Sequence, residues 1–191
     1  FKNSAYSVQI YYAILGIFTM LMTTAFVNSA AARDFQHGFS GLLFSTSLSK
    51  SAFLFGRFFA SALVAIIPLL GISAGVLLAP LMPWADPVRF GPVIWAAHAK
   101  GIFYFALPNT LFVAAVVFCI AALTRSTITS FLGTLVLLVG YIVSDTLAGD
   151  LDNEKIAILL DPLGIRAYSI VSKYWTAAER NAATIALEGW F

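Results

Sequence analysis

Few side chains in this 191-residue sequence could perform chemistry, and they stand far apart. The two histidines, His37 and His98, lie in separate polar connections without companions at metal-ligand spacing, which favours polar surface residues over ligands. Asp145 is the only charged residue inside the four long apolar runs of the sequence. An acid within a membrane-spanning helix is a candidate for function, but Asp145 stands near the end of its run, which favours a hydrated helix end.

The sequence motifs of common enzymes are absent. No GxxxxGK[ST] phosphate loop occurs, so the chain does not hydrolyse ATP by that route, and neither HExxH nor GxSxG is present. No cysteine–histidine cluster has metal-ligand spacing, and the single Cys119 cannot form an intrachain disulfide. An intramembrane enzyme built on Asp145 would need a second catalytic group, which the runs lack. We therefore expect no catalytic, cofactor or metal site in this chain.

The composition indicates a membrane protein. Hydrophobic residues make up 60% of the chain and charged residues only 10%, with a mean hydropathy of +0.90. A soluble domain has about 25% charged residues and could not bury this much apolar surface in one core. The net charge of +2 is too small for a surface that binds nucleic acid. These values exclude a soluble enzyme, a disordered tail and a nucleic-acid-binding module.

The apolar residues form four runs that are each long enough to cross a membrane. A helix needs about 20 apolar residues to span the hydrocarbon core. We expect an all-α membrane protein whose transmembrane domain is residues 1–148, with a tight turn at 124–127 that makes the last two spans antiparallel neighbours. The predicted spans are residues 8–27, 58–79, 101–123 and 128–148.

Prolines and small residues within the spans predict local features of the helices. Pro68 and the GxxxG pair Gly71 and Gly75 lie in the second span, where small residues allow close approach of another helix, although a chance patch explains the pair equally well. Pro108 in the third span removes a backbone hydrogen bond. Neighbouring helices or Asn109 must then satisfy the freed carbonyl, so we expect a kink there.

Two polar stretches have amphipathic patterns. In residues 28–57, one helical face would carry Phe35, Phe39, Leu42 and Leu43, and such a helix would rest on the membrane surface or on a partner. In residues 149–191, Asp161-Pro162 is typical of a helix start, and Thr176 and Glu179 have the spacing of a capping box opening a helix through Leu187. An apolar stripe and two aromatic anchors predict that this tail lies in the membrane interface: Ile165, Tyr168, Val171, Tyr174 and Trp175.

The stretch between the first two spans resembles the cytoplasmic loop of type-2 ATP-binding-cassette (ABC) permeases. The resemblance rests on NSAAARD at 28–34, GLLFSTSLSK at 41–50 and FLFGR at 53–57. Later segments are similar, in their order, to a bacterial branch of these permeases that is often linked to a zinc aminopeptidase-like domain. They are DPVRFGP at 86–92, ALPN at 106–109, AALTRS at 121–126, LDPLG at 160–164 and YWTAAERN at 174–181.

The resemblance implies a place in a six-helix permease. The four spans would be helices two to five, so we expect the chain to be a fragment lacking the first and last transmembrane helices. Residues 28–57 would be the cytoplasmic coupling segment and 149–191 extracytoplasmic amphipathic helices. The residues implied to couple to an ATPase, through a helix starting near Arg33, are Arg33, Asp34, Phe35, Phe39, Leu42, Leu43 and Lys50.

The implied function is ATP-driven export across the bacterial inner membrane. ATP and Mg would bind to a separate ABC ATPase subunit, and a second permease half and membrane lipids would be the other partners. The positive-inside rule opposes this orientation, because four of the 11 Lys and Arg fall on the proposed inner side and seven on the outer side. The alternative is a membrane anchor or scaffold of an aminopeptidase-like protein without transport. The cargo stays open between lipids, hydrophobic peptides and antibiotics.

Overall fold

The chain folds as an all-α protein in the computed structural model, which describes residues 1–39, 41, 45, 47, 49–147 and 154–185. Four helical segments are long and apolar enough to span a membrane, as the sequence predicts. Leu42 and Leu43 lie outside the described residues, as does the predicted end of the last helix at Leu187. The four segments are Ala5–Gln36, Lys50–Leu81, Trp95–Thr124 and Thr127–Leu147.

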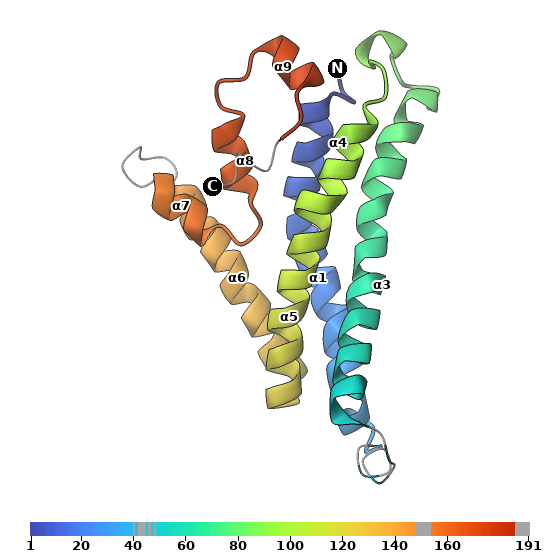
Figure 1. The fold of residues 1–191 in the computed structure, drawn as a ribbon, viewed down its shortest axis with the longest axis vertical. Coiled ribbons are helices and arrows are strands. Elements are labelled where there is room, and N and C mark those ends of the chain that lie inside the picture. Colours follow the sequence, from blue (N-terminus) through green and yellow to red (C-terminus); the bar gives the residue numbers. More distant parts are fainter. Residues whose placement is uncertain (40, 42–44, 46, 48, 148–153, 186–191) are drawn as a thin grey trace.

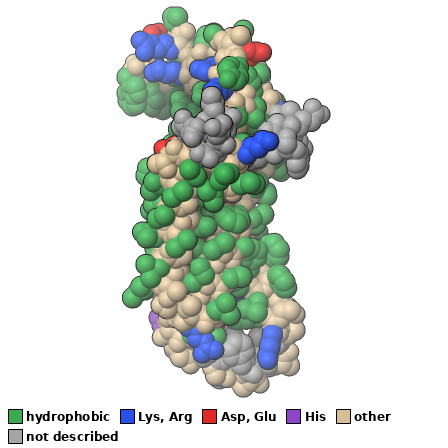
Figure 2. All heavy atoms as spheres, turned by 90° about the vertical axis from the view of Figure 1, so that its left-hand side faces the viewer, with side chains coloured by type: hydrophobic (Ala, Val, Ile, Leu, Met, Phe, Trp, Pro, Cys, Tyr) green, Lys and Arg blue, Asp and Glu red, His purple; other side chains and the backbone are tan. Residues whose placement is uncertain are grey.

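Helix α1 (Ala5–Gln36) lies at the centre of the bundle. It packs against α3 (Lys50–Leu78), α5 (Leu107–Thr124) and α6 (Thr127–Leu147). In the most apolar stretch of each helix, 44% of α1 is buried but only 17% of α3 and of α6. The outward faces of α3 and α6 are therefore apolar and exposed, as helices in contact with lipid must be. Figure 2, which views the molecule from the side of α6, shows green side chains over the middle of this face and blue ones toward the two ends.

The third span is one long helix built from three parts. A short helix α4 (Trp95–Lys100) leads into a π-helical stretch, η3 (Gly101–Ala106), and then into α5. Pro108 stands in the first turn of α5, directly after the π-helical stretch. The kink expected at Pro108 stays a prediction.

The turn between α5 and α6 is short, as predicted. Arg125 ends α5 with a left-handed backbone (φ 55°), and its N–H donates to the carbonyl of Ala121 at 2.8 Å. The hydroxyl of Ser126 accepts from the N–H of Thr129 at 3.4 Å, at the start of α6. The two helices are neighbours that run in opposite directions, and α6 diverges from the bundle toward α7 (Glu154–Leu160) in Figure 1.

Helices α8 (Ile165–Val171) and α9 (Ala177–Ala182) pack beside the beginning of α1, and α7 packs against α6. The capping box predicted for Thr176 and Glu179 is present, but α9 ends at Ala182 and not at Leu187. The Asp161-Pro162 prediction is wrong in its position, because α8 starts at Ile165. The Asp161 carboxylate nevertheless accepts from the backbone N–H of Arg166 at 2.6 Å, within the first turn.

Candidate functional site

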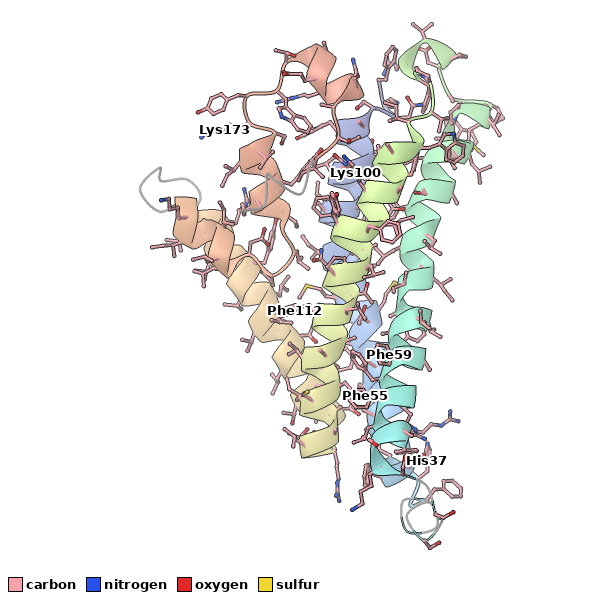
Figure 3. The ribbon with its side chains drawn as sticks, viewed as in Figure 1. His37, Phe55, Phe59, Lys100, Phe112 and Lys173 are labelled. Carbon is pink, nitrogen blue, oxygen red and sulfur yellow. The ribbon has the colours of Figure 1, made fainter. Side chains whose placement is uncertain are left out.

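The predicted coupling residues lie at the end of the bundle opposite to the short helices. Arg33, Asp34 and Phe35 belong to the last turn of α1, and Lys50 is the first residue of α3. Figure 3 marks this end by His37, with Lys100 and Lys173 toward the other end. The structure thus places the start and the finish of the coupling segment on two adjoining helices.

The expectation of a separate helix starting near Arg33 is wrong. Helix α1 continues without a break from the first span through Gln36, because no proline or glycine interrupts residues 28–37. Gly38 then takes a positive φ of 74°, a conformation that favours glycine and ends the helix. Phe35 and Phe39 therefore do not share one helical face, and Phe39 lies in the turn after α1 with 61% of its surface exposed.

Asp34 forms an ion pair with Arg57 that ties the end of α1 to α3. The carboxylate Oδ2 lies 2.7 Å from Nη1, and the two side chains are only 15% and 27% exposed. Arg57 also donates to the carbonyl of Ala30 at 2.8 Å and covers the ring of Phe53 at 4.5 Å. Sequence reasoning missed this pair because the two residues are 23 positions apart, although both stand in segments of the family resemblance.

A second set of contacts ties the end of α1 to the turn between α5 and α6. The guanidinium of Arg125 lies 4.2 Å from the ring centre of Phe35. The amides of Gln36 and Asn28 both donate to the hydroxyl of Thr127, at 2.9 and 3.1 Å. Phe35 was predicted to face an ATPase, but here it packs against Arg125 because α1 brings it beside that turn. Residues of the coupling segment thus join α1 to α3 and also contact the turn between α5 and α6.

The predicted packing residues have different surroundings. A side chain at Gly71 or Gly75 would meet nothing within 4 Å, so no helix of the described chain packs against the GxxxG pair. The side chain of Asn109 donates to the carbonyl of Leu163 at 2.8 Å, and not to a carbonyl freed by Pro108. Asn109 therefore joins the third span to the loop before α8. Pro68 stands inside α3, as its sequence position requires.

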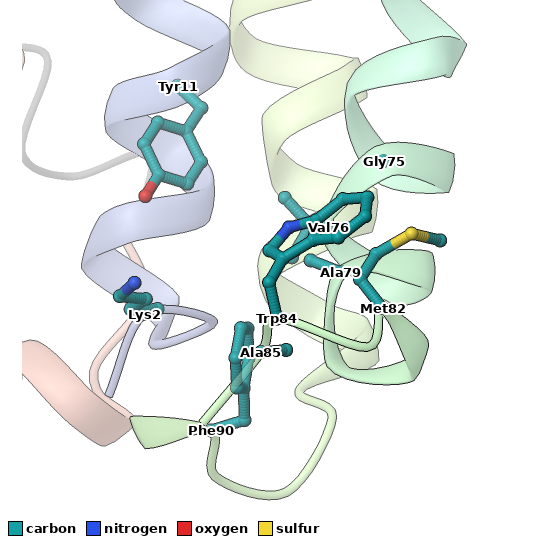
Figure 4. Close-up of a pocket in the computed structure, with 9 residues that line it drawn as sticks. All are labelled: Lys2, Tyr11, Gly75, Val76, Ala79, Met82, Trp84, Ala85 and Phe90. Atoms are coloured by element: carbon teal, nitrogen blue, oxygen red, sulfur yellow. The ribbon is translucent and has the colours of Figure 1, made fainter. Parts of the chain in front are cut away.

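Gly75 borders an open hollow at the end where α1 begins. The hollow measures about 290 Å³ and lies between the beginning of α1 and the end of α3, with the indole of Trp84 across it (Figure 4). Lys2 supplies its cationic side chain. The remaining lining is mostly apolar: Tyr11, Val76, Ala79, Met82, Ala85 and Phe90. Gly75 lines the hollow without a side chain.

His98 is buried, which corrects its assignment as a surface residue. It is 5% exposed, and its Nδ1 lies 2.8 Å from the hydroxyl of Ser73, which in turn lies 2.6 Å from the hydroxyl of Tyr12. The three residues come from α4, α3 and α1, so the chain of hydrogen bonds links three spans. Sequence reasoning missed it because Trp95–Lys100 is helical and continues the third span, whereas the apolar run was taken to begin at Gly101.

Asp145 has a partner that its sequence position did not indicate. It pairs with Arg166 of α8, with side chains 49% and 24% exposed. Beside it, the hydroxyl of Ser144 donates to the carbonyl of Ala157 at 2.7 Å. These contacts hold the tail against the end of α6, and the partial exposure of Asp145 agrees with a helix end that water reaches.

The tail packs on the bundle more closely than an interfacial helix would. Tyr168 is fully buried, stacks on Tyr6 with ring centres 5.7 Å apart, and donates to the side-chain oxygen of Gln9 at 3.1 Å. Burial raises the pKa of the Tyr168 hydroxyl well above its ordinary value. Trp175 lies edge-on to Tyr168, so the predicted anchor contacts protein, while Tyr174 remains 84% exposed.

No group of three residues with metal-binding side chains occurs in the part of the chain that the structure describes. Comparison with family models, curated proteins and solved structures finds no match to this chain. The candidate site therefore rests on the coupling segment and its contacts with the spanning helices.

Proposed function

We propose that the chain is the membrane-spanning part of an ABC transporter permease that is driven by a separate ATPase. The observation that supports the proposal is the ion pair between Asp34 and Arg57, which joins the two ends of the coupling segment. The contact of Phe35 with Arg125 adds the turn between α5 and α6. A force applied to this segment would act on α1, α3, α5 and α6 together.

In this proposal the ATPase contacts the turn after α1, where the side chain of Phe39 is exposed. Movement of the turn would shift the ends of α1 and α3 as one unit, because the Asp34–Arg57 pair holds them together. A rigid-body rocking of two permease halves would then alternate the access of cargo and export it. ATP and Mg²⁺ bind to the partner ATPase, and the permease chain itself lies in the bacterial inner membrane.

Co-purification tests this proposal. An ATPase encoded beside this chain should remain bound to the wild-type protein and to Tyr174→Asp, an exposed aromatic residue at the other end of the bundle. Phe39→Asp should reduce the ATPase retained by at least ten-fold, because a carboxylate in an apolar docking contact lacks a partner. If both variants retain equal amounts of ATPase and insert normally into the membrane, the ATPase does not dock on this turn.

The second candidate is a membrane anchor or scaffold without transport. Asp145, the only charged residue in the four apolar runs, favours it, because this acid pairs with Arg166 of the tail and leaves those runs without an unpaired charge. A neighbouring reading frame with a phosphate loop would favour transport, and its absence would favour the anchor. Stimulation of ATP hydrolysis by the reconstituted chain distinguishes the two directly.

A further inference from the structure

A groove of about 330 Å³ lies between α1 and α3, near the end where α1 finishes and α3 begins. Each helix contributes four residues at the spacing i, i+3, i+4 and i+7, which places them on one face. The lining residues are Phe26, Ser29, Ala30 and Arg33 from α1 and Arg57, Ala60, Ser61 and Val64 from α3.

The groove changes from cationic to apolar along its length. Because α1 and α3 are antiparallel, Arg33 and Arg57 lie together at one end, whereas Phe26 and Val64 lie at the other. The residues between them have small side chains, so the helices leave a hollow there. Seven residues of helix separate the two ends, which corresponds to about 10 Å. The groove thus has the length of a headgroup phosphate and the first carbons of an acyl chain.

The cationic end carries an excess of positive charge. Arg57 is engaged by Asp34, by the carbonyl of Ala30 and by the ring of Phe53. Arg33 is exposed, and its side chain has no hydrogen-bond or ion-pair partner among the residues that the structure describes. Two guanidinium groups therefore face a single carboxylate. An anion with several oxygens would balance this charge and match the geometry of the free guanidinium.

The position of the groove selects the kind of anion. Arg33 stands in the last turn of α1 and Arg57 two turns into α3, near the end of the bundle where lipid headgroups would lie, while Phe26 and Val64, 41% and 45% exposed, lie farther from that end. Basic pockets between transmembrane helices bind anionic headgroups. A helix of a partner protein suits the groove poorly, because it would enclose Arg33 without supplying the missing negative charge.

We propose that the groove between α1 and α3 binds one anionic phospholipid. Its phosphate contacts Arg33 beside the Asp34–Arg57 pair, and the beginning of an acyl chain lies over Ala60 between Phe26 and Val64. The proposal requires membrane insertion but not transport, so its success or failure is independent of the ATPase experiment. A lipid at this place would bridge the two helices that the coupling segment joins.

Native mass spectrometry of the full chain in detergent tests the charge contact. Phosphatidylglycerol should bind more tightly than phosphatidylcholine with the same acyl chains. Arg33→Gln should weaken phosphatidylglycerol binding about five-fold, the effect expected for one basic residue, and phosphatidylcholine binding less, because the choline ammonium offsets the charge of that lipid's phosphate. Lys50→Gln, which removes a cation at the same end but outside the groove, should have no effect. An equal loss with Lys50→Gln would indicate diffuse surface charge and overturn the proposal.

Filling the hollow tests the acyl contact. Ala60→Leu should weaken the binding of both lipids at this site, whereas Ala25→Leu, exposed on α1 outside the groove, should not. Circular dichroism reports whether the variants keep their helices, and Arg33→Gln alone decides the matter if Ala60→Leu does not fold. The proposal fails if glycerol 1-phosphate competes as well as the intact lipid. It also fails if the groove variants abolish a dimer and leave lipid binding unchanged.

Discussion

The ion pair between Asp34 and Arg57 should contribute measurably to stability. A charge-assisted hydrogen bond contributes about 1.5–3 kcal/mol, and an exposed ion pair about 0.2–1 kcal/mol. The side chains here are 15% and 27% exposed, which places the expected coupling energy between these ranges, at about 1–2 kcal/mol. Arg57→Gln should cost more than Asp34→Asn, because Arg57 also holds the carbonyl of Ala30 and covers the ring of Phe53.

A double-mutant cycle isolates the pair from these additional contacts. Asp34→Asn, Arg57→Gln and the double variant are unfolded in mixed micelles with increasing denaturing detergent, and helix content reports the free energy of unfolding. The pair Asp86–Arg89 serves as the control, since its charged atoms are 3.3 Å apart and its side chains are 54% and 64% exposed. Its cycle should give about 0.5 kcal/mol or less. A coupling energy for Asp34–Arg57 no larger than that of the control would refute the reasoning.

Three further predictions follow from other contacts. Gly101→Ala should destabilise the protein by about 1–3 kcal/mol, because a Cβ there would lie 2.4 Å from the buried ring of Tyr12; Gly71→Ala, which meets nothing, should be neutral or stabilising in the same unfolding assay. Asn109→Ala should cost about 1 kcal/mol and raise hydrogen exchange in the loop before α8. Burial raises the pKa of Asp161 against the lowering effect of its backbone N–H bonds, so the folded tail binds the proton more tightly than the unfolded chain. Exchange protection of α8, corrected for intrinsic rates, should therefore fall as pH rises from the ordinary aspartate range through the raised pKa, and Asp161→Asn should abolish this dependence.

The sequence predicts the spans well because membrane insertion depends on local hydropathy. All four apolar runs are helices, and the α5–α6 turn lies where the break at 124–127 indicates. The helix ends are less predictable, because a polar residue such as Asp34 or His98 can continue an apolar helix when a neighbouring helix supplies its partner. The apolar run stops before these residues, whereas the hydrogen bonds of the helical backbone continue through them.

The contacts of the candidate site depend on the tertiary arrangement. Asp34 and Arg57 meet only because α1 and α3 are antiparallel and adjacent, and Asp145 meets Arg166 only because the tail folds back along α6. A local pattern carries no information on such pairs. The capping box of Thr176 and Glu179 was predictable because both partners lie within one turn.

The π-helical stretch Gly101–Ala106 sets the direction in which the side chains of α4 point relative to those of α5. One residue added to or removed from a helix rotates everything on one side of it by about 100° relative to the other side. Deletion of a single residue in this stretch would restore a regular α-helix and turn His98 away from Ser73, while leaving the faces of α5 in place. An alignment of related sequences is therefore expected to show a one-residue gap here wherever the histidine is replaced by an apolar residue.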